Sequence, residues 1–394
     1  MGREAFIVSA CRTPIGTYQG TLAPFPAPAL GALAIADAVK RAGIEAEQID
    51  EVIMGQVVQA AAGQAPARQA AIRGGIPPSV ACMTINKVCG SGLKAVMLAA
   101  QSIRAGDGDL FLAGGMESMS NTPYALDRAR NGYRLGHGKL IDIMIHDGLW
   151  DSFNDFHMGA AAEYTAEKSK IPRARQDEFA AASHAKALAA ISGGKFKAEI
   201  VSVWVPQRKG DPVLFDTDEC PRAGTTAQSL AKLKPAFQKD GTVTPGNAPG
   251  LNDGAACTVV ASGETVKARG LKPLARVVDY AVAGVEPKEL FYAPIFAVQK
   301  LMKKMGVRIG HFDLIEANEA FSVQALADGD GLGWEWERVN VHGGAVALGH
   351  PIGASGARIL ATLIYALKGR GKKTGLATLC LGGGNAVAMA IEIV

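Results

Sequence analysis

The chain has 394 residues, more than one ordinary hydrophobic core accommodates, so two or three domains are expected. Apolar residues make up 48% and charged residues 20%, as in ordinary globular proteins, and no apolar run reaches membrane-spanning length. The net charge of +4 comes from intermixed acidic and basic residues, which argues against nucleic acid and suits a small anionic ligand. Six cysteines without metal-type or redox-type spacing, and an N-terminus without signal-peptide anatomy, predict a reduced cytoplasmic protein that binds no metal.

The first 120 residues alternate short apolar strands with helices. Hydrophobic periodicity predicts strands at 5–10, 52–58 and 109–113. The same periodicity and the glycines that end helices predict a helix at 29–42, a second one that ends at residue 72 and a third at 93–103. This alternation predicts an α/β fold with a largely parallel sheet covered on both faces.

Residues 121–246 differ in texture, with more charged and aromatic residues and little clear periodicity. We expect an inserted, more irregular domain here. Within it, the segment 133–150 is apolar and aromatic, and such a segment usually marks an association surface. We therefore expect this segment to contact another copy of the chain.

The last third repeats the plan of the first third. An acidic-led strand at 312–317 corresponds to one at 49–54, and the glycine-ended strand at 376–384 corresponds to one at 110–115. We expect two similar βαβ-rich halves, with ligands at the carboxyl ends of their strands. The expected divisions are 1–120 plus 247–268, the insertion 121–246, and 269–394.

Cys89 lies in a Cys-Gly-Ser-Gly turn that leads directly into a helix. Backbone N–H groups and the dipole at a helix N-terminus favour an anion, so the pattern predicts a lowered thiol pKa and a nucleophile. The two glycines after Cys89 permit close approach of a ligand. A buried structural cysteine is the alternative.

Three later segments also place residues of types common in active sites at strand-to-helix or strand-to-strand turns. They contain Asn318 at 318–321, His350 in the glycine-laced loop 340–356, and Cys380 at 380–384. Taken singly, Asn318 could be a helix cap, His350 a structural histidine and Cys380 a small core residue. Four such sites at the turns of a duplicated α/β fold favour a shared chemical role.

These four segments together resemble the thiolase family, in its acetyl-CoA acetyltransferase branch, over essentially the whole chain. The resemblance implies a five-layered αβαβα core built from two similar halves, with an inserted loop domain that binds coenzyme A. It also implies a homotetramer, acetyl-CoA, acetoacetyl-CoA and coenzyme A as ligands, and no further cofactor.

The resemblance further implies a role for each residue. Cys89 is acylated, His350 takes its proton, and Cys380 removes the α-proton of the incoming acetyl-CoA. His350 and a water held by Asn318 form one oxyanion hole, and the backbone N–H groups of Cys89 and Gly382 form another. Family members line the coenzyme A site at positions that correspond here to His157, Met158, Arg222, Ser229, Phe237 and Phe321, although these could simply be packing residues.

The chain departs from the family pattern at three places. His342 replaces a usual Asn and is expected to shape the loop rather than take part in catalysis. Pro249 replaces a Ser and cannot make the side-chain hydrogen bond to pantetheine that the resemblance implies. The pair Phe291-Tyr292 replaces a smaller, glycine-containing run, which predicts an acyl pocket of changed shape.

Several other functions remain open from the sequence. A 3-ketoacyl-CoA thiolase with broader chain-length or 2-methyl-branched specificity would use the same residues. A decarboxylating ketoacyl synthase would need a second His or an Asn in place of Cys380. A catalytically inactive lipid-binding module of the same fold would have no need for Cys89, Asn318, His350 and Cys380. A papain-like hydrolase lacks its characteristic Cys-Trp segment here.

Overall fold

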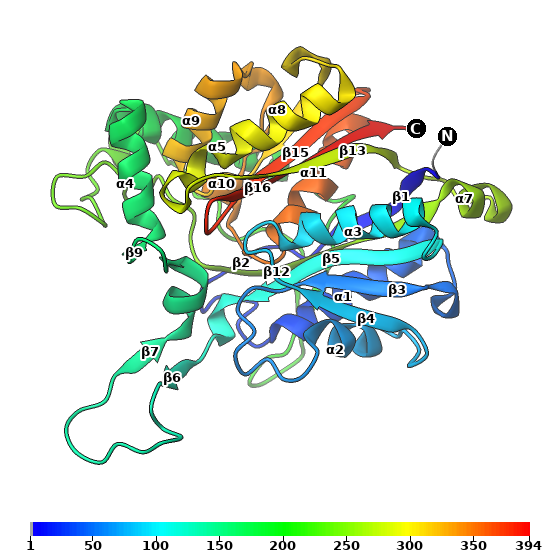
Figure 1. Cartoon of the computed structure of the whole chain (residues 1–394), viewed down its shortest axis with the longest axis horizontal. Coiled ribbons are helices and arrows are strands. Elements are labelled where there is room, and N and C mark those ends of the chain that lie inside the picture. The colour runs from blue at the N-terminus through cyan, green and yellow to red at the C-terminus, as the bar shows by residue number, and fades with distance from the viewer. Residues whose placement is uncertain (1–2) are drawn as a thin grey trace.

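A computed structural model describes residues 3–394 and shows two half-sheets on either side of a pair of central helices (Figure 1). The central helices are α3 (Ser91–Ala105) and α11 (Ser355–Gly369), and they pack against each other and against both half-sheets. Helices α1 (Ala27–Ala42) and α2 (Pro66–Arg73) cover the outer face of the N-terminal half, and α8 (Ala293–Met305) covers the outer face of the C-terminal half. This arrangement is the expected five-layered αβαβα core.

The two central helices approach so closely that only glycine fits at their crossing. A Cβ on Gly92 would lie 2.7 Å from the backbone nitrogen of Ala357, and a Cβ on Gly356 would meet the backbone of Leu93. Both glycines lie in the first turn of their helix. The crossing therefore brings the N-terminal ends of α3 and α11 together.

The two half-sheets repeat one strand order. The N-terminal half runs β1-β12-β5-β3-β4 and the C-terminal half runs β13-β16-β15-β14, and pairing of β1 with β13 joins them into one ten-stranded sheet that also includes β2. The strands are β1 (Ala5–Arg12), β2 (Gly16–Thr17), β3 (Glu51–Gly55), β4 (Ala81–Ile85), β5 (Leu110–Ser118), β12 (Asn252–Ser262), β13 (Ala275–Gly284), β14 (Leu314–Ala317), β15 (Thr374–Leu381) and β16 (Asn385–Ile393).

The predicted duplication is confirmed by this order. Strand β14 takes the place in its half that β3 takes in the other, and β15 corresponds to β5. Both correspondences were expected from the acidic-led and glycine-ended strands. The parallel pairing of β3 with β5 also recurs as that of β14 with β15.

The predicted largely parallel sheet is wrong, because most of the neighbouring strands are antiparallel. Parallel pairs among the described strands are β3–β4, β3–β5 and β14–β15. Strands β15 and β16 are joined by the three-residue turn 382–384, and so short a connection permits only antiparallel pairing. Strand β12 returns from the insertion and runs antiparallel to both β1 and β5.

The insertion is less irregular than its sequence predicts. It contains the long helices α4 (Met158–Ser169) and α5 (Arg173–Ser192), whose buried faces consist largely of alanine and small polar residues and so show weak hydrophobic periodicity. Its other elements are β6 (Tyr124–Leu126), β7 (Leu140–Asp142), the π-helix η3 (Met144–Leu149), β8 (Trp150–Asp151), β9 (Phe156–His157), β10 (Val203–Val205), β11 (Val213–Phe215) and α6 (Ala227–Leu230). The remaining helices of the chain include α7 (Gly263–Arg269), η4 (Pro287–Tyr292), α9 (Ser322–Leu332) and α10 (Ala345–Leu348).

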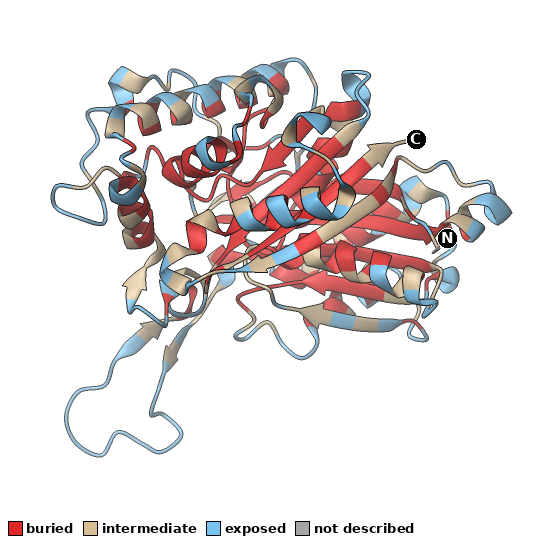
Figure 2. Cartoon of the chain, turned by 45° about the horizontal axis from the view of Figure 1, so that its top comes forward, coloured by how far each residue is buried: buried red, intermediate tan, exposed pale blue. Residues whose placement is uncertain are grey.

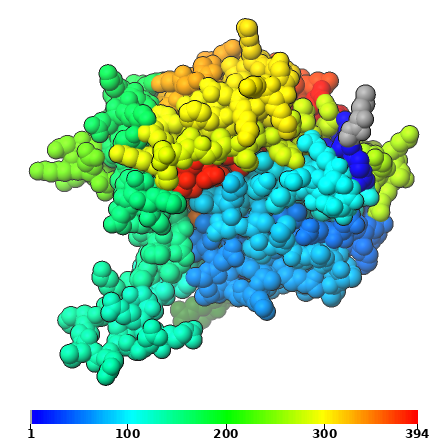
Figure 3. All heavy atoms as spheres, viewed as in Figure 1, coloured from blue at the N-terminus to red at the C-terminus, as the bar shows by residue number. Residues whose placement is uncertain are grey.

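A hairpin of β6 and β7 projects far from the body of the molecule (Figures 1 and 3). Its tip and the segment that follows leave large apolar side chains in solvent. Leu135 is fully exposed, and Leu140 is 64% exposed. Burial elsewhere is concentrated in the sheet and the two central helices, as Figure 2 shows.

A buried ion-pair network fastens the insertion to the core. Arg12 on β1 is 0% exposed and donates to Glu199 Oε1 at 2.6 Å and to Asp218 at 2.7 and 2.9 Å. Thr362 on α11 donates to the same Glu199 oxygen at 3.0 Å. Because both carboxylates come from the insertion, this network joins three parts of the chain.

We predict that Arg12→Met destabilises the protein by about 3–5 kcal/mol, because two buried carboxylates lose their cation. The matched control is Arg338→Met, whose surface pair with Glu335 should contribute about 0–1 kcal/mol. Urea denaturation of both variants checks this, and equal losses would contradict the role assigned to Arg12.

Candidate active site

One apolar cavity of about 340 Å³ lies where the two halves and the insertion meet. It contains Cys89 from one half together with His350, Cys380 and Gly382 from the other. The insertion and its flanks supply most of the remaining wall. The predicted residues on this wall are Cys89, His157, Met158, Phe237, Phe321, His350, Cys380 and Gly382.

Cys89 lies in a tight turn between β4 and α3. Val88 has a φ of +46°, a left-handed conformation that β-branched residues strongly disfavour. Asn86 Oδ1 accepts from the Val88 N–H at 2.9 Å, and Ser91 Oγ accepts from the Lys87 N–H at 2.8 Å and donates to the Val88 carbonyl at 2.7 Å. These three bonds hold the strained turn that carries the thiol.

The predicted lowering of the Cys89 pKa is wrong. Although Cys89 is partly accessible from the cavity, desolvation by the surrounding protein raises the pKa of its thiol to about 12. Hydrogen bonds from the backbone N–H groups of Cys89 and Gly382 oppose this rise without cancelling it. The backbone N–H groups of Cys89 and Gly382 therefore both point at the Cys89 sulfur, while the resting residue is a thiol.

His350 is held as a neutral base. Its Nδ1 lies 2.6 Å from Ser355 Oγ, and that hydroxyl donates its proton to the Pro351 carbonyl at 2.9 Å. With the hydroxyl proton on that carbonyl, Nδ1 carries the ring proton and Nε2 keeps a lone pair, which the Asn318 amide faces at 3.4 Å. Burial, and secondarily the charge of Arg358, lower the pKa of His350 to about 3. The backbone N–H of His350 donates to Asn252 Oδ1 at 2.8 Å and fixes the loop.

Asn318 is a neighbour of His350 and not a helix cap. Helix α9 begins at Ser322 with Phe321 at its cap position. The side chain of Asn318 is buried, and its Nδ2 lies 3.4 Å from Nε2 of His350. The simple capping interpretation is thus excluded.

Cys380 is the last residue but one of β15, and Gly382 begins the turn that follows. Burial raises the pKa of Cys380 well above its usual range, and the nearby Cys89 and Asp328 add to the rise. A Cβ on Gly382 would lie 3.2 Å from Val88, and Gly384 has a φ of +80° with the backbone of Val285 against it. The glycines of this turn are therefore needed partly for packing within the protein.

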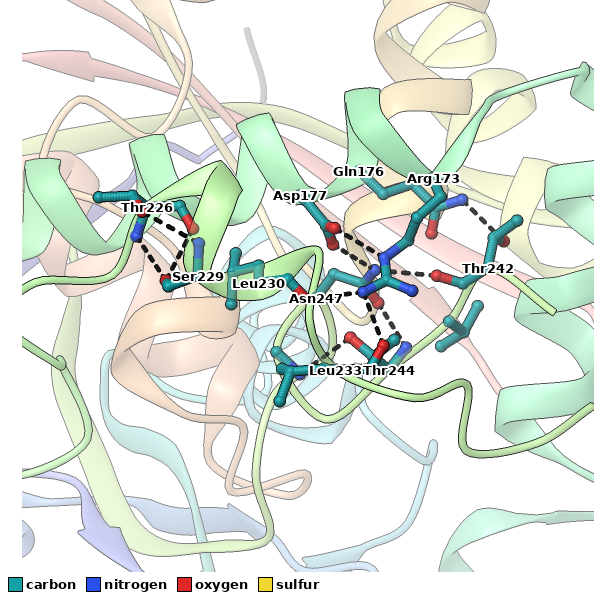
Figure 4. Close-up of polar contacts among 12 residues, drawn as sticks. Arg173, Gln176, Asp177, Thr226, Ser229, Leu230, Leu233, Thr242, Thr244 and Asn247 are labelled. Atoms are coloured by element: carbon teal, nitrogen blue, oxygen red, sulfur yellow. Dashed lines mark hydrogen bonds and ion pairs between the residues drawn. The ribbon is translucent and has the colours of Figure 1, made fainter.

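The expected coenzyme A residues divide into two groups. His157 and Phe237 stack at 4.9 Å between ring centroids on the cavity wall, and Phe321 packs edge-on against Phe237. Arg222 and Ser229 are exposed and lie outside the cavity lining. Ser229 is engaged in a reciprocal capping box with Thr226 (Figure 4).

A polar network centred on Asn247 supports the adjoining wall, 245–251 (Figure 4). Asn247 Nδ2 donates to Asp177 at 2.9 Å and its Oδ1 accepts from the Thr244 N–H at 2.8 Å. Arg173 completes the network by donating to Asp177 at 2.7 Å. Pro249 lies on this wall and contributes apolar surface to it.

The other two departures from the family pattern, at Phe291-Tyr292 and at His342, lie in different surroundings. Phe291 lies on the cavity wall and packs edge-on against Phe321, while the Tyr292 hydroxyl bonds with Ser169 at 2.6 Å. His342 lies outside the cavity lining and packs edge-on against Phe196, and burial lowers its pKa to about 4. His342 therefore packs against the insertion and does not face the cavity.

Several supporting residues were not singled out from the sequence. Ser355 and Asn252 orient His350, and Glu117 accepts from the N–H groups of Val57, Val58 and Gly353. Burial raises the pKa of Glu117 to about 8. An acidic residue at the end of an otherwise apolar strand was the one available signal for Glu117.

Among residues 3–394, no group of three or more His, Cys, Asp or Glu side chains is placed to hold a metal ion. Within the same residues, no helix is both long and apolar enough to cross a membrane. All six cysteines are free thiols.

Comparisons with known proteins place the chain in a family. Residues 5–264 match the thiolase N-terminal domain and residues 271–393 match the thiolase C-terminal domain. The acetyl-CoA acetyltransferases of Pseudomonas aeruginosa and Cupriavidus necator are 57% and 55% identical to the chain, each over 99% of both sequences. The crystal structure of the Bacillus anthracis acetyl-CoA acetyltransferase superposes with a TM-score of 0.98 at 45% identity, covering 100% of this chain and 99% of that one. The chain belongs to the thiolase family.

Proposed function

We propose that this protein is an acetyl-CoA acetyltransferase, which joins two acetyl-CoA molecules into acetoacetyl-CoA and coenzyme A and also runs the reverse thiolysis. The observation that carries the proposal is the meeting of Cys89, His350 and Cys380 on one apolar cavity, with two backbone N–H groups on the Cys89 sulfur. The names of the relatives support it. The reaction requires no cofactor beyond its coenzyme A thioesters.

The first half-reaction acetylates Cys89. The thiol transfers its proton to Nε2 of His350, and the sulfur attacks the thioester carbonyl of acetyl-CoA. The negative oxygen of the tetrahedral intermediate is stabilised by the N–H groups of Cys89 and Gly382. When the carbon–sulfur bond to coenzyme A breaks, the departing thiolate receives the proton from His350. Acetyl-Cys89 and free coenzyme A result.

The second half-reaction forms the carbon–carbon bond. Transfer of the Cys380 proton to His350 leaves a thiolate, which removes an α-proton from the second acetyl-CoA. The enolate oxygen is then stabilised by the Nε2–H of His350 and by a water held by Asn318. The enolate carbon attacks the acetyl carbonyl, the bond to the Cys89 sulfur breaks, and His350 returns a proton to that sulfur.

The cavity wall is suited to the pantetheine arm. His157, Met158, Phe237 and Phe321 provide apolar surface against its chain, whereas the exposed Arg222 and Ser229 are suited to the polar nucleotide end. The proposal includes a reducing cytoplasmic compartment, because both reactive cysteines must remain thiols. It also includes a homotetramer, formed as a dimer of dimers.

We expect incubation with acetyl-CoA to acetylate Cys89. Peptide mass spectrometry should find one acetyl group on the peptide that contains it, and Cys89→Ser should lose the modification. The buried Cys257 lies on β12 away from the cavity and serves as an internal control. If acetyl groups were found on other cysteines while Cys89 stayed unmodified, the assignment of Cys89 as the nucleophile would be refuted, and with it the proposed function.

We expect Cys380→Ser to separate the two half-reactions. A serine hydroxyl is far too weak an acid to supply the α-carbon base, so condensation and thiolysis should fall by at least about 10³-fold, while acetylation of Cys89 persists. Burst acetylation measured beside steady-state turnover checks this. If acetylation falls as far as turnover does, Cys380 is not a dedicated base for the α-carbon.

We expect light scattering at micromolar concentration to report a tetramer. The β6–β7 hairpin exposes apolar residues that a partner chain would bury, as do Ile145 and Trp150 beyond it. Leu135→Asp with Leu140→Asp should shift the mass to a dimer. A monomeric mass for the unmodified protein would refute the proposed assembly.

A further inference from the structure

A buried pair of opposite charges lies beside the Asn318–His350 contact and is not used by the chemistry above. Glu316 on β14 and Arg358 on α11 are each 2% exposed, and Arg358 Nη1 lies 3.5 Å from Glu316 Oε2. Within residues 3–394, neither carboxylate oxygen and none of the three guanidinium nitrogens makes a hydrogen bond. A buried pair of this kind does not recover the cost of desolvating its charges. Stability therefore does not account for it.

Glu316 and Arg358 lie on the strand and the helix that adjoin Asn318 and His350 of the candidate active site. Glu316 and Asn318 are two residues apart along one extended segment, since the Asn318 N–H continues the pairing of β14 with β15 at 3.0 Å. Their side chains therefore leave the same face of the strand. Arg358 lies one helical turn after Ser355, which holds Nδ1 of His350. The strand and the helix thus meet through Glu316 and Arg358, and the segments that flank them, after β14 and before α11, meet through Asn318 and His350.

The charges around the pair leave Arg358 incompletely neutralised. The groups that face it are Arg12 from β1, Glu199, Glu319 and, on the side of Glu316, Lys186 from α5. Glu199 is already bonded to Arg12 and Thr362. Burial raises the pKa of Glu316 to about 8 and Arg358 opposes the rise, so this carboxyl only partly neutralises the guanidinium at neutral pH. A net positive charge therefore remains behind His350 and disfavours its imidazolium form.

We propose that Glu316 and Arg358 are a positioning pair, which braces β14 against α11 and keeps His350 beside Asn318 as a neutral base. The inference rests on the proposed function, because it acts through the proton transfer between Cys89 and His350. Neither residue lines the cavity, so neither contacts substrate.

The decisive variant replaces both members, Glu316→Leu with Arg358→Met. Single replacements leave an uncompensated buried group and can fail to fold, whereas an apolar pair of similar volume commonly maintains or raises stability. We expect a folded protein with a Tm no lower than the original, an unchanged KM for acetoacetyl-CoA and a kcat lowered by about 10²-fold, the effect of misplacing a catalytic group.

The pH dependence of Cys89 acetylation distinguishes a positioning role of the pair from a purely structural one. Without the guanidinium, the pKa of His350 rises. In the pH–rate profile of Cys89 acetylation, the acid limb should therefore move to higher pH. Thr362→Val is the matched control: it removes a buried hydrogen bond one turn further along α11 without removing a charge, and should leave kcat and the acid limb unchanged. In an Asn318→Ala background, the double replacement should cause little additional loss of kcat.

Three results would overturn the inference. They are retention of kcat and of the acid limb in the double variant, loss of activity only in proportion to a lowered Tm, or an equal shift of the acid limb in Thr362→Val. Failure of the proposed function is distinguishable, because the unmodified protein would then show no acetylation of Cys89 before any variant is compared.

Discussion

The glycine contact between the two central helices is the constraint on which the rest of the site depends. Because Gly92 and Gly356 let α3 and α11 touch backbone to backbone, the turns that precede these helices converge on one point. Cys89 lies in the first turn and His350 in the loop before the second. A side chain at either glycine would drive the helices apart and separate Cys89 from His350.

The chemistry of the site is set by burial more than by formal charge. Desolvation keeps Cys89 a thiol and His350 a neutral imidazole, so the resting site holds no exposed ionic pair that water would stabilise. The backbone N–H groups of Cys89 and Gly382 already point at the Cys89 sulfur, where negative charge would develop in the proposed reaction. Fixed dipoles of this kind need no reorganisation during the reaction, which makes them effective in an apolar cavity.

Prediction from the sequence succeeded where a short pattern determines local geometry. The helix after Cys89, the strand before Asn318 and the equivalence of β3 with β14 all follow from apolar spacing and glycine positions. The direction of strand pairing was missed because it depends on connections, such as the turn at 382–384, that periodicity does not describe. The Cys89 pKa was missed because desolvation is a property of the assembled cavity. Ser355 and Asn252 were missed for a similar reason, since His350 meets Asn252 only after the chain has folded.

The division of the site between the two halves has a consequence for how the protein is made. A ribosome releases Cys89 and its turn long before β14, α11 and β15 exist, and α3 lacks its packing partner until then. During that interval Cys89 has neither His350 nor the Gly382 N–H beside it. The cavity is therefore complete only when α11 and β15 have packed against the first half, and a truncated chain would carry Cys89 without His350, Cys380 or Gly382 around it.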